Sequence, residues 1–207
     1  GNQGVNEMDV ARWGLGVTLP TRVCAMGGHL MFQDDQNTPN VLIATFEFPN
    51  PAGRGEKKKL LQFEVRHWWV NCELDLAPEK TGNTYMTSAA NTVGNLFYGA
   101  KGYMAKNANE WKAFLGPKLE PGPSGTGEGN HYADFMDAIR AGKPALARGD
   151  IREGFYSCAL VHLANISYRL GRSLDFDPAK IEFRNDSEAN AMLSRNYRSP
   201  FVFPNRV

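Results

Sequence analysis

The sequence predicts an α+β fold: a large, mostly antiparallel, open-faced sheet with helices packed on one face. Strand patterns dominate up to residue 115, and the two longest helical patterns follow within residues 131–171. Strands followed by helices are typical of α+β domains rather than of alternating βαβ units. The strand pattern at residues 60–68 alternates apolar and polar residues, which indicates a sheet with one covered face and one open face.

The composition suits a folded domain of 207 residues with a core of its own. Hydrophobic residues make up 42% of the chain and aromatic residues 11%, which is enough for a substantial core. Lys and Arg number 23 against 22 Asp and Glu, and one basic run, Lys57–Lys59, stands beside Glu56. Nucleic-acid binding needs a concentrated basic face, so we exclude nucleic acid as a partner and interpret the run as a solvated hairpin tip.

The three cysteines, Cys24, Cys72 and Cys158, are odd in number, far apart and without a histidine at ligand spacing. We therefore expect neither a disulfide framework nor a metal site, and we interpret the thiols as buried and inert. The chain has no apolar run of transmembrane length and no signal peptide. We expect a soluble protein of the bacterial cytoplasm or periplasm, with no membrane partner.

The first helix is expected over residues 4–13. Its apolar residues recur at spacings of three and four, and Gly14 and Gly16 follow as stop signals. Asn2 and Asn6 stand four residues apart, hence on one face of the helix. Taken alone, these polar residues are explained by an N-cap and a solvated first turn.

Strands are expected at residues 21–26, 41–48 and 60–68, the last two forming a hairpin across residues 51–56, and short strands at residues 96–104 and 110–115. Residues 69–90 are irregular and polar. The Pro- and Gly-rich stretch Gly116–Asn130 lacks the preceding strand and the Lys-Ser/Thr ending of a phosphate-binding loop. We interpret it as a mobile surface loop.

Two helices with clear end signals follow. Asn130 caps a helix over residues 131–141 with one apolar stripe, ended by Gly142. Asp150 starts a second helix that runs to Gly171 and is apolar over more than half of its circumference, so we expect it to be the helix most deeply buried against the sheet. A short strand at residues 174–176 and a helix capped by Ser187, running to about residue 195, complete the pattern.

The start of the chain fits the frame Gly-x-x-x-x-Asp-x-x-Arg-Trp, formed by Gly4, Asp9, Arg12 and Trp13. This frame resembles the start of the C-terminal domain in the Gfo/Idh/MocA family of NAD(P)-dependent sugar and cyclitol oxidoreductases. Further segments resemble that domain in the same order: residues 35–40, 63–66, 99–103, 132–137, 162–171 and 186–200. The resemblance implies the open-faced sheet described above, preceded by a Rossmann domain that this chain lacks. Because the chain opens on Gly1 rather than Met, we expect residues 1–207 to be one excised C-terminal domain.

The resemblance places Asn2 and Asn6 at the positions of the family's catalytic Asp and His. An amide does not titrate in the useful range and cannot serve as a general acid or base, but it can donate and accept hydrogen bonds to hydroxyl groups. The resemblance therefore implies a substrate site lined by Asn2, Gln3 and Asn6, more firmly than it implies proton transfer.

Arg66 and His67 are further candidates for binding a substrate. They precede Trp68 and Trp69, and a sugar site combines aromatic planes with hydrogen-bond donors. Packing in the core or at a subunit interface is the simpler role for the two tryptophans. Glu64 and Arg66 most simply form a charged cross-strand network.

Three other candidates have structural explanations. Asp34 and Asp35 fit a turn better than a metal site. His162 shares a helix face with Phe155 and Cys158, which favours a hydrogen-bonded core histidine. His131 stands in the first turn of a helix, where structure alone explains it.

Three hypotheses for function follow. The first is the substrate-binding and oligomerisation domain of an oxidoreductase acting on a sugar or cyclitol hydroxyl, with NAD or NADP and the usual catalytic Lys in the upstream domain and no cofactor bound by this chain alone. The second is a relative that cleaves glycosides by transient oxidation with bound NAD. The third is a non-catalytic carbohydrate-binding or assembly domain, because asparagines stand at positions 2 and 6. The open sheet face with Gln62, Glu64 and Arg66 is the expected homo-oligomer surface.

Overall fold

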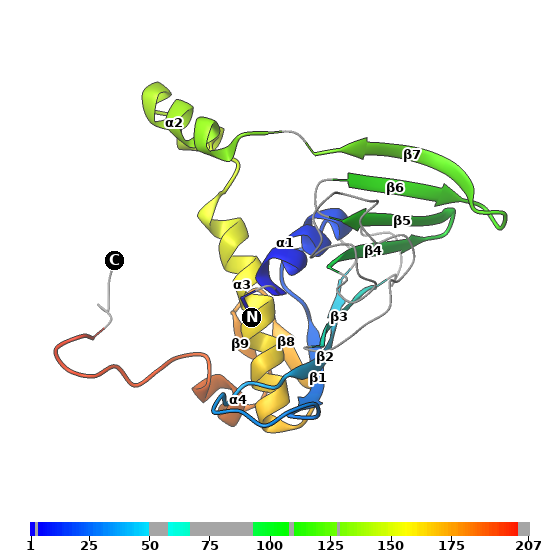
Figure 1. The fold of residues 1–207 in the computed structure, drawn as a ribbon. Coiled ribbons are helices and arrows are strands. Elements are labelled where there is room, and N and C mark those ends of the chain that lie inside the picture. The colour runs from blue at the N-terminus through cyan, green and yellow to red at the C-terminus, as the bar shows by residue number, and fades with distance from the viewer. Residues whose placement is uncertain (3, 50–57, 67–92, 108–109, 128, 203–207) are drawn as a thin grey trace.

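The computed structural model describes residues 1–2, 4–49, 58–66, 93–107, 110–127 and 129–202 (Figure 1). The described strands form two antiparallel sheets, one in the order β3-β2-β1-β8-β9 and one in the order β4-β5-β6-β7. The α+β class and the antiparallel pairing are confirmed, with the strands divided between two sheets. The predicted loop 51–56, the irregular stretch 69–90, Gln3, His67, Trp68, Trp69 and Cys72 lie outside the described residues.

The five-stranded sheet has one covered face and one open face, as expected. Its strands are β1 Arg22–Gly28, β2 Val41–Phe48, β3 Lys59–Arg66, β8 Leu174–Asp177 and β9 Glu182–Phe183. The buried positions alternate along β1 and β2, and the core side chains of these two strands are Val23, Ala25, Leu42, Ala44, Phe46 and Phe48. This alternation follows from the two-residue period of a strand.

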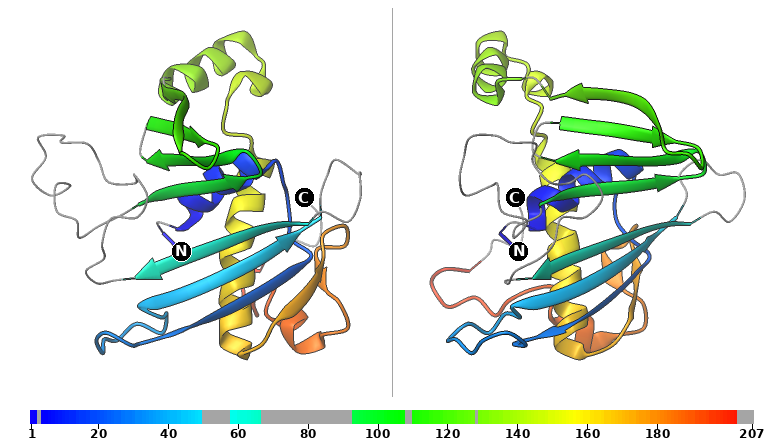
Figure 2. Two further views of the ribbon diagram at one scale, coloured as in Figure 1. Left: turned by 90° about the vertical axis from the view of Figure 1, so that its right-hand side faces the viewer. Right: turned by 45° about the vertical axis from the view of Figure 1, so that its right-hand side comes forward.

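Helix α3, Ile151–Leu170, packs against the covered face of this sheet (Figures 1 and 2). The Asp150 side chain caps its start by accepting a hydrogen bond from the Arg152 amide at 2.7 Å, and Gly171 ends it at a φ of 67°. The predicted burial against the sheet is confirmed for its C-terminal half. At its start, Ile151 is 87% exposed and Phe155 44% exposed.

The four-stranded sheet consists of β4 Gly94–Gly99, β5 Gly102–Asn107, β6 Glu110–Leu115 and β7 Glu120–Thr126. Strand β7 lies within Gly116–Asn130, so the prediction of a mobile loop there was wrong. Proline is tolerated in a strand when its missing N–H faces an open edge. Because Pro121 and Pro123 are two residues apart on the edge strand, both missing donors fall on the same side.

Helix α2, His131–Ala141, has the predicted bounds and stands apart from both sheets (Figure 1). The Asn130 side chain accepts hydrogen bonds from the Tyr132 and Ala133 amides, and Gly142 ends the helix at a φ of 61°. The helix packs against the short 3-10 turn Pro144–Leu146. Its apolar stripe is exposed, at Tyr132, Phe135, Met136 and Ile139.

Several local predictions need correction. Helix α4 covers Ser187–Ala191, and its cap is Asp186, whose carboxylate accepts a hydrogen bond from the Ala189 amide at 3.0 Å. Cys24 and Cys158 are exposed rather than buried, because Cys24 lies on the open face of β1 and Cys158 on a side of α3 that is not covered by the described residues. In the basic run, Lys59 belongs to β3 and its ammonium donates to the Leu15 carbonyl, so the hairpin-tip interpretation was wrong there.

An exposed ion pair links β1 to β8. The Arg22 Nε donates to Asp175 Oδ1 at 2.7 Å, and this hydrogen bond holds the pKa of Asp175 below its ordinary value. A carboxyl whose pKa is lowered by folding contributes stability above its unfolded pKa and loses that stability as the pH falls through its folded pKa. We expect Arg22→Ala to raise the pKa of Asp175 in a carboxyl ¹³C NMR titration, whereas Arg140→Ala leaves it unchanged.

Candidate functional site

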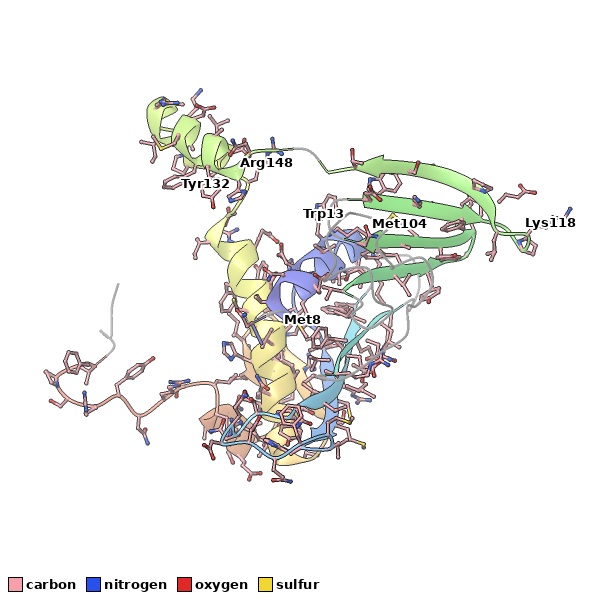
Figure 3. All side chains as sticks on the ribbon, in the orientation of Figure 1. Met8, Trp13, Met104, Lys118, Tyr132 and Arg148 are labelled. Carbon is pink, nitrogen blue, oxygen red and sulfur yellow. The ribbon has the colours of Figure 1, made fainter. Side chains whose placement is uncertain are left out.

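Helix α1, Gly4–Leu15, has two clearly different faces. Gly4, Met8, Ala11 and Arg12 are buried. On the opposite side, the exposed residues Asn2, Asn6, Asp9 and Trp13 follow one another at spacings of four, three and four, which places them on one face of a helix. We call these four residues the α1 stripe. Figure 3 shows Met8 and Trp13 on opposite sides of the helix.

Two glycines allow α1 to pack closely against both sheets. A Cβ on Gly4 would lie 2.9 Å from the Phe63 ring of β3, and one on Gly14 would lie 2.4 Å from the Phe97 ring of β4. The Asn95 amide of β4 also donates to the Glu7 carboxylate at 2.7 Å. Helix α1 therefore bridges the two sheets. Gly14 was predicted to end the helix, but it lies inside it, where its missing side chain permits close packing.

Arg12 fixes α1 to α3. The whole residue is 3% exposed. Its Nε donates to Ser157 Oγ at 3.2 Å, Nη1 donates to the Val17 carbonyl at 2.9 Å, and Nη2 pairs with the Glu153 carboxylate. The Ser157 hydroxyl lies 2.5 Å from Asp9 Oδ1, to which it donates. Five donors in a rigid fork suit a guanidinium to such a set of acceptors, so α1 has little freedom to move along α3.

The first turn of α1 presents Asn2 and Asn6 to solvent. The Val5 amide donates to the Gly1 carbonyl at 3.1 Å, so helical bonding begins at the first residue. Gly1 itself lies against α3, since a Cβ there would be 3.0 Å from Val161. The two amide side chains stand exposed on one face beside this contact, as the spacing predicted.

Arg66 ends β3, and the tip of β3 lies near the N-terminus in both views of Figure 2. Its Nε lies 3.1 Å from Glu64 Oε1, so these two charges pair along one strand. Their cross-strand network stays a prediction. The structure thus places Asn2 and Asn6 on one exposed face of α1. The strand that carries Arg66 packs against the opposite, buried side of the helix, at Gly4. Gln3 and His67 remain predictions, outside the described residues.

The remaining polar candidates do not join this site. His162 is exposed, so its interpretation as a core histidine was wrong. The Asp34 carboxylate accepts from the Gln36 amide at 3.0 Å, which confirms the turn. His131 packs on the Tyr132 ring, with ring centroids 4.1 Å apart. Across the described ranges, no group of three His, Cys, Asp or Glu side chains could hold a metal ion.

A hollow of about 330 Å³ lies away from α1, between α2 and residues 147–149. Its lining is His131, Tyr132, Phe135, Ala147, Arg148 and Gly149; Tyr132 and Arg148 are labelled in Figure 3. None of the predicted substrate residues lines it.

Sequence reasoning missed the contacts of Arg12 with Glu153 and Ser157, which we call the Arg12 clamp. It also missed the exposure of Trp13. Glu153 was noted only as part of a capping-box pattern, and nothing local marks Ser157 as the partner of a residue 145 positions earlier. The signal available was Arg12 in the opening motif, since a charged side chain on the buried side of a helix needs partners elsewhere.

The arrangement can bind hydroxyl groups through exposed amides on a rigidly held helix. The two antiparallel sheets and four α-helices of the described residues define an α+β domain. A sequence model described as "Oxidoreductase family, C-terminal alpha/beta domain", of the Gfo/Idh/MocA group, matches residues 96–203, slightly more than half of the chain. The chain belongs to the Gfo/Idh/MocA oxidoreductase family, as its C-terminal domain. The match begins in β4 and does not include α1.

Solved structures that match the chain include a proposed oxidoreductase from Thermotoga maritima, with 13% identity and a TM-score of 0.47, over 82% of this chain and 44% of that one. The WlbA dehydrogenase from Bordetella pertussis, in complex with NADH and UDP-GlcNAcA, shows 14% identity and a TM-score of 0.46 over 85% of this chain and 45% of that one. WlbA from Chromobacterium violaceum, in complex with the same two molecules, shows 14% identity and a TM-score of 0.45, over 86% and 45%. The chain thus spans less than half the length of these proteins.

No curated protein sequence matches the chain. Within the described parts of the chain, no helix combines the length and the apolar character needed to cross a membrane.

Proposed function

We propose that this chain is the substrate-binding and oligomerisation domain of an NAD(P)-dependent oxidoreductase that acts on a sugar or cyclitol hydroxyl. The observation that carries the proposal is the exposed pair Asn2 and Asn6 at the start of α1, on a helix that Arg12 locks to α3. Membership of the family supplies the reaction class. The amides hold the substrate hydroxyls by hydrogen bonds.

In this proposal the nicotinamide is bound by a separate domain of a longer protein. When bound, NAD or NADP accepts the hydride from the substrate carbon. The residues of this chain contribute by positioning, because hydride transfer needs that carbon held in contact with the nicotinamide. A helix fixed at one end by buried hydrogen bonds supports such positioning, since it loses little further freedom on binding.

The test is an NADH fluorescence titration of this 207-residue chain beside a longer protein that joins it to a nucleotide-binding domain. We expect only the longer protein to bind NADH and to reduce NAD or NADP with a sugar or polyol panel, detected at the nicotinamide absorbance. Binding by the short chain alone would contradict the division of roles. Turnover of a glycoside without net NADH formation would instead favour the transient-oxidation reading.

A second candidate function, a non-catalytic carbohydrate-binding or assembly domain, is favoured by one observation: both family positions for proton transfer carry asparagine. Restoring them with Asn2→Asp and Asn6→His in the longer protein separates the candidates. A gain in turnover supports a site that still positions substrate. If no polyol reacts with or without the restored pair, the assembly role is preferred.

The open face of the five-stranded sheet is the proposed self-association surface. Met26 and Ile43, directly opposite each other on β1 and β2, are 78% and 42% exposed, and Leu60 on β3 is 69% exposed. Exposed apolar patches rimmed by polar residues are typical of protein interfaces. The polar residues Gln62, Glu64 and Arg66 follow Leu60 on the same face.

We expect Ile43→Lys to weaken the oligomer at least tenfold, measured by sedimentation velocity across a concentration series. Burial of the lysine at an interface removes its ammonium group from water, and this desolvation is costly even where a carboxylate stands nearby. Within one chain the new lysine stands opposite Glu64, so folding should be preserved. Ile151→Lys, at a site 87% exposed on α3, is the matched control and should leave assembly unchanged. A monomeric unmodified chain at high concentration would refute this surface.

A further inference from the structure

Trp13 is the one aromatic residue of α1, and it is 82% exposed. Indole is a large apolar surface, and leaving it in water forgoes the free energy that burial would give. It lies on the α1 stripe, in line with Asn2, Asn6 and Asp9. The residue therefore belongs to the same face as the proposed substrate site.

The α1 stripe is longer than one sugar ring. Asn6 and Trp13 are seven residues apart, which corresponds to about 10 Å along a helix axis at 1.5 Å per residue. Between them stands Asp9, whose side chain is 54% exposed while its Oδ1 accepts from Ser157. The order along the helix is thus amide, amide, carboxylate and indole, with the carboxylate held in place.

We propose that the α1 stripe binds a carbohydrate of at least two rings, a disaccharide or a glycoside, with one ring at Asn2 and Asn6 and the next ring stacked on Trp13. The proposal rests on the proposed function, since it takes the first turn of α1 as the substrate site. The C–H face of a sugar ring is apolar and packs on an indole, while its hydroxyls are bonded at the ring edge. Asp9 lies where it can accept hydrogen bonds from hydroxyls of either ring.

The Arg12 clamp makes this stripe rigid. Arg12 neighbours Trp13 and is bonded to both Ser157 and Val17, so the helix turn that carries the indole is fixed before a ligand arrives. Preorganisation reduces the entropy lost on binding. A single-ring ligand at Asn2 and Asn6 does not span the distance to the indole.

The experiment measures dissociation constants of the 207-residue chain by calorimetry, with saturation-transfer NMR to locate the contacted ring. The probes are glucose and myo-inositol as single rings, and cellobiose and maltose as two-ring ligands. We expect Trp13→Ala to weaken binding of at least one disaccharide about five- to tenfold and to leave the single-ring probes within about twofold. Trp13→Phe should restore most of the affinity.

The control is Tyr132→Ala, which removes an aromatic side chain that is 74% exposed on α2, away from the stripe; it should change no dissociation constant. Because Trp13 is exposed, Trp13→Ala should melt at the same temperature as the unmodified chain by circular dichroism.

Three outcomes overturn the inference: disaccharide binding that ignores Trp13, equal weakening of single- and two-ring probes, or no binding of any probe to the unmodified chain. Dissociation of a dimer by Trp13→Ala would also overturn it, because a second copy would then cover the indole. The proposed function is judged separately. Turnover of single-ring polyols by the longer protein keeps it standing even where the two-ring inference fails.

Discussion

Replacing Arg12 with leucine is expected to lower the free energy of unfolding by about 2–4 kcal/mol. Arg12 is buried and donates to Ser157, to the Val17 carbonyl and to Glu153. Leucine fills part of the volume but leaves these acceptors without their donor. The cost lies below that of a fully buried pair because the Glu153 side chain is 54% exposed and water can replace part of the interaction.

Chemical denaturation in urea measures this change. Arg12→Lys keeps the charge but has a single ammonium in place of a planar fork, so an intermediate loss is expected. Arg140→Ala on α2 removes an exposed arginine that pairs with Asp137 at 3.1 Å and should change the free energy of unfolding by less than about 0.5 kcal/mol. Equal effects of Arg12→Leu and Arg140→Ala would show that the clamp contributes nothing. Weaker binding of glucose and myo-inositol by Arg12→Lys than by the unmodified chain would show that the Arg12 clamp supports the proposed substrate site.

Gly14→Ala and Gly154→Ala are expected to change stability in opposite directions. Both glycines lie inside helices, where alanine is intrinsically better by up to about 1 kcal/mol. At Gly14 the new methyl group would lie 2.4 Å from the Phe97 ring, whereas at Gly154 nothing stands within 4 Å. Overpacking costs about 1–3 kcal/mol, so Gly14→Ala should be destabilising by about 1–2 kcal/mol and Gly154→Ala stabilising by about 0.5 kcal/mol.

Thermal and urea unfolding of the two variants provide the comparison. A further consequence distinguishes them: the methyl group at position 14 pushes α1 away from β4, so the hydrogen bond between Glu7 and Asn95 should weaken. Loss of amide protection around Asn95 in hydrogen exchange would report it. If Gly14→Ala is as stabilising as Gly154→Ala, the close packing of α1 against β4 is refuted.

Local signals predicted most of the secondary structure. The bounds of β2 and α2 were predicted correctly, because alternation, an Asn cap and a glycine at positive φ act within a few residues of the element they define. Strand β7 was missed because prolines and glycines argue against a strand unless it is known to lie at an edge. Position in a sheet is set by the other strands and is absent from the local pattern.

The candidate site was predicted in part. The positions of Asn2 and Asn6 on one exposed face followed from their spacing. The exposure of Cys24, Cys158 and His162 could not be inferred, because an apolar helix or strand face looks the same whether or not another element covers it. The stripe that continues to Trp13 became visible only once the buried side of α1 was known.

The sequence by itself determined the family, the α+β class and the residues offered at the start of α1, since these depend on composition, order and short-range spacing. The tertiary structure decided how that start is held. Arg12 and Ser157 are separated by 145 positions, and Gly4 and Gly14 owe their role to Phe rings on two different sheets. Such contacts depend on which surfaces pack together in the folded chain. A sequence pattern that repeats every two or four residues contains no information about that packing.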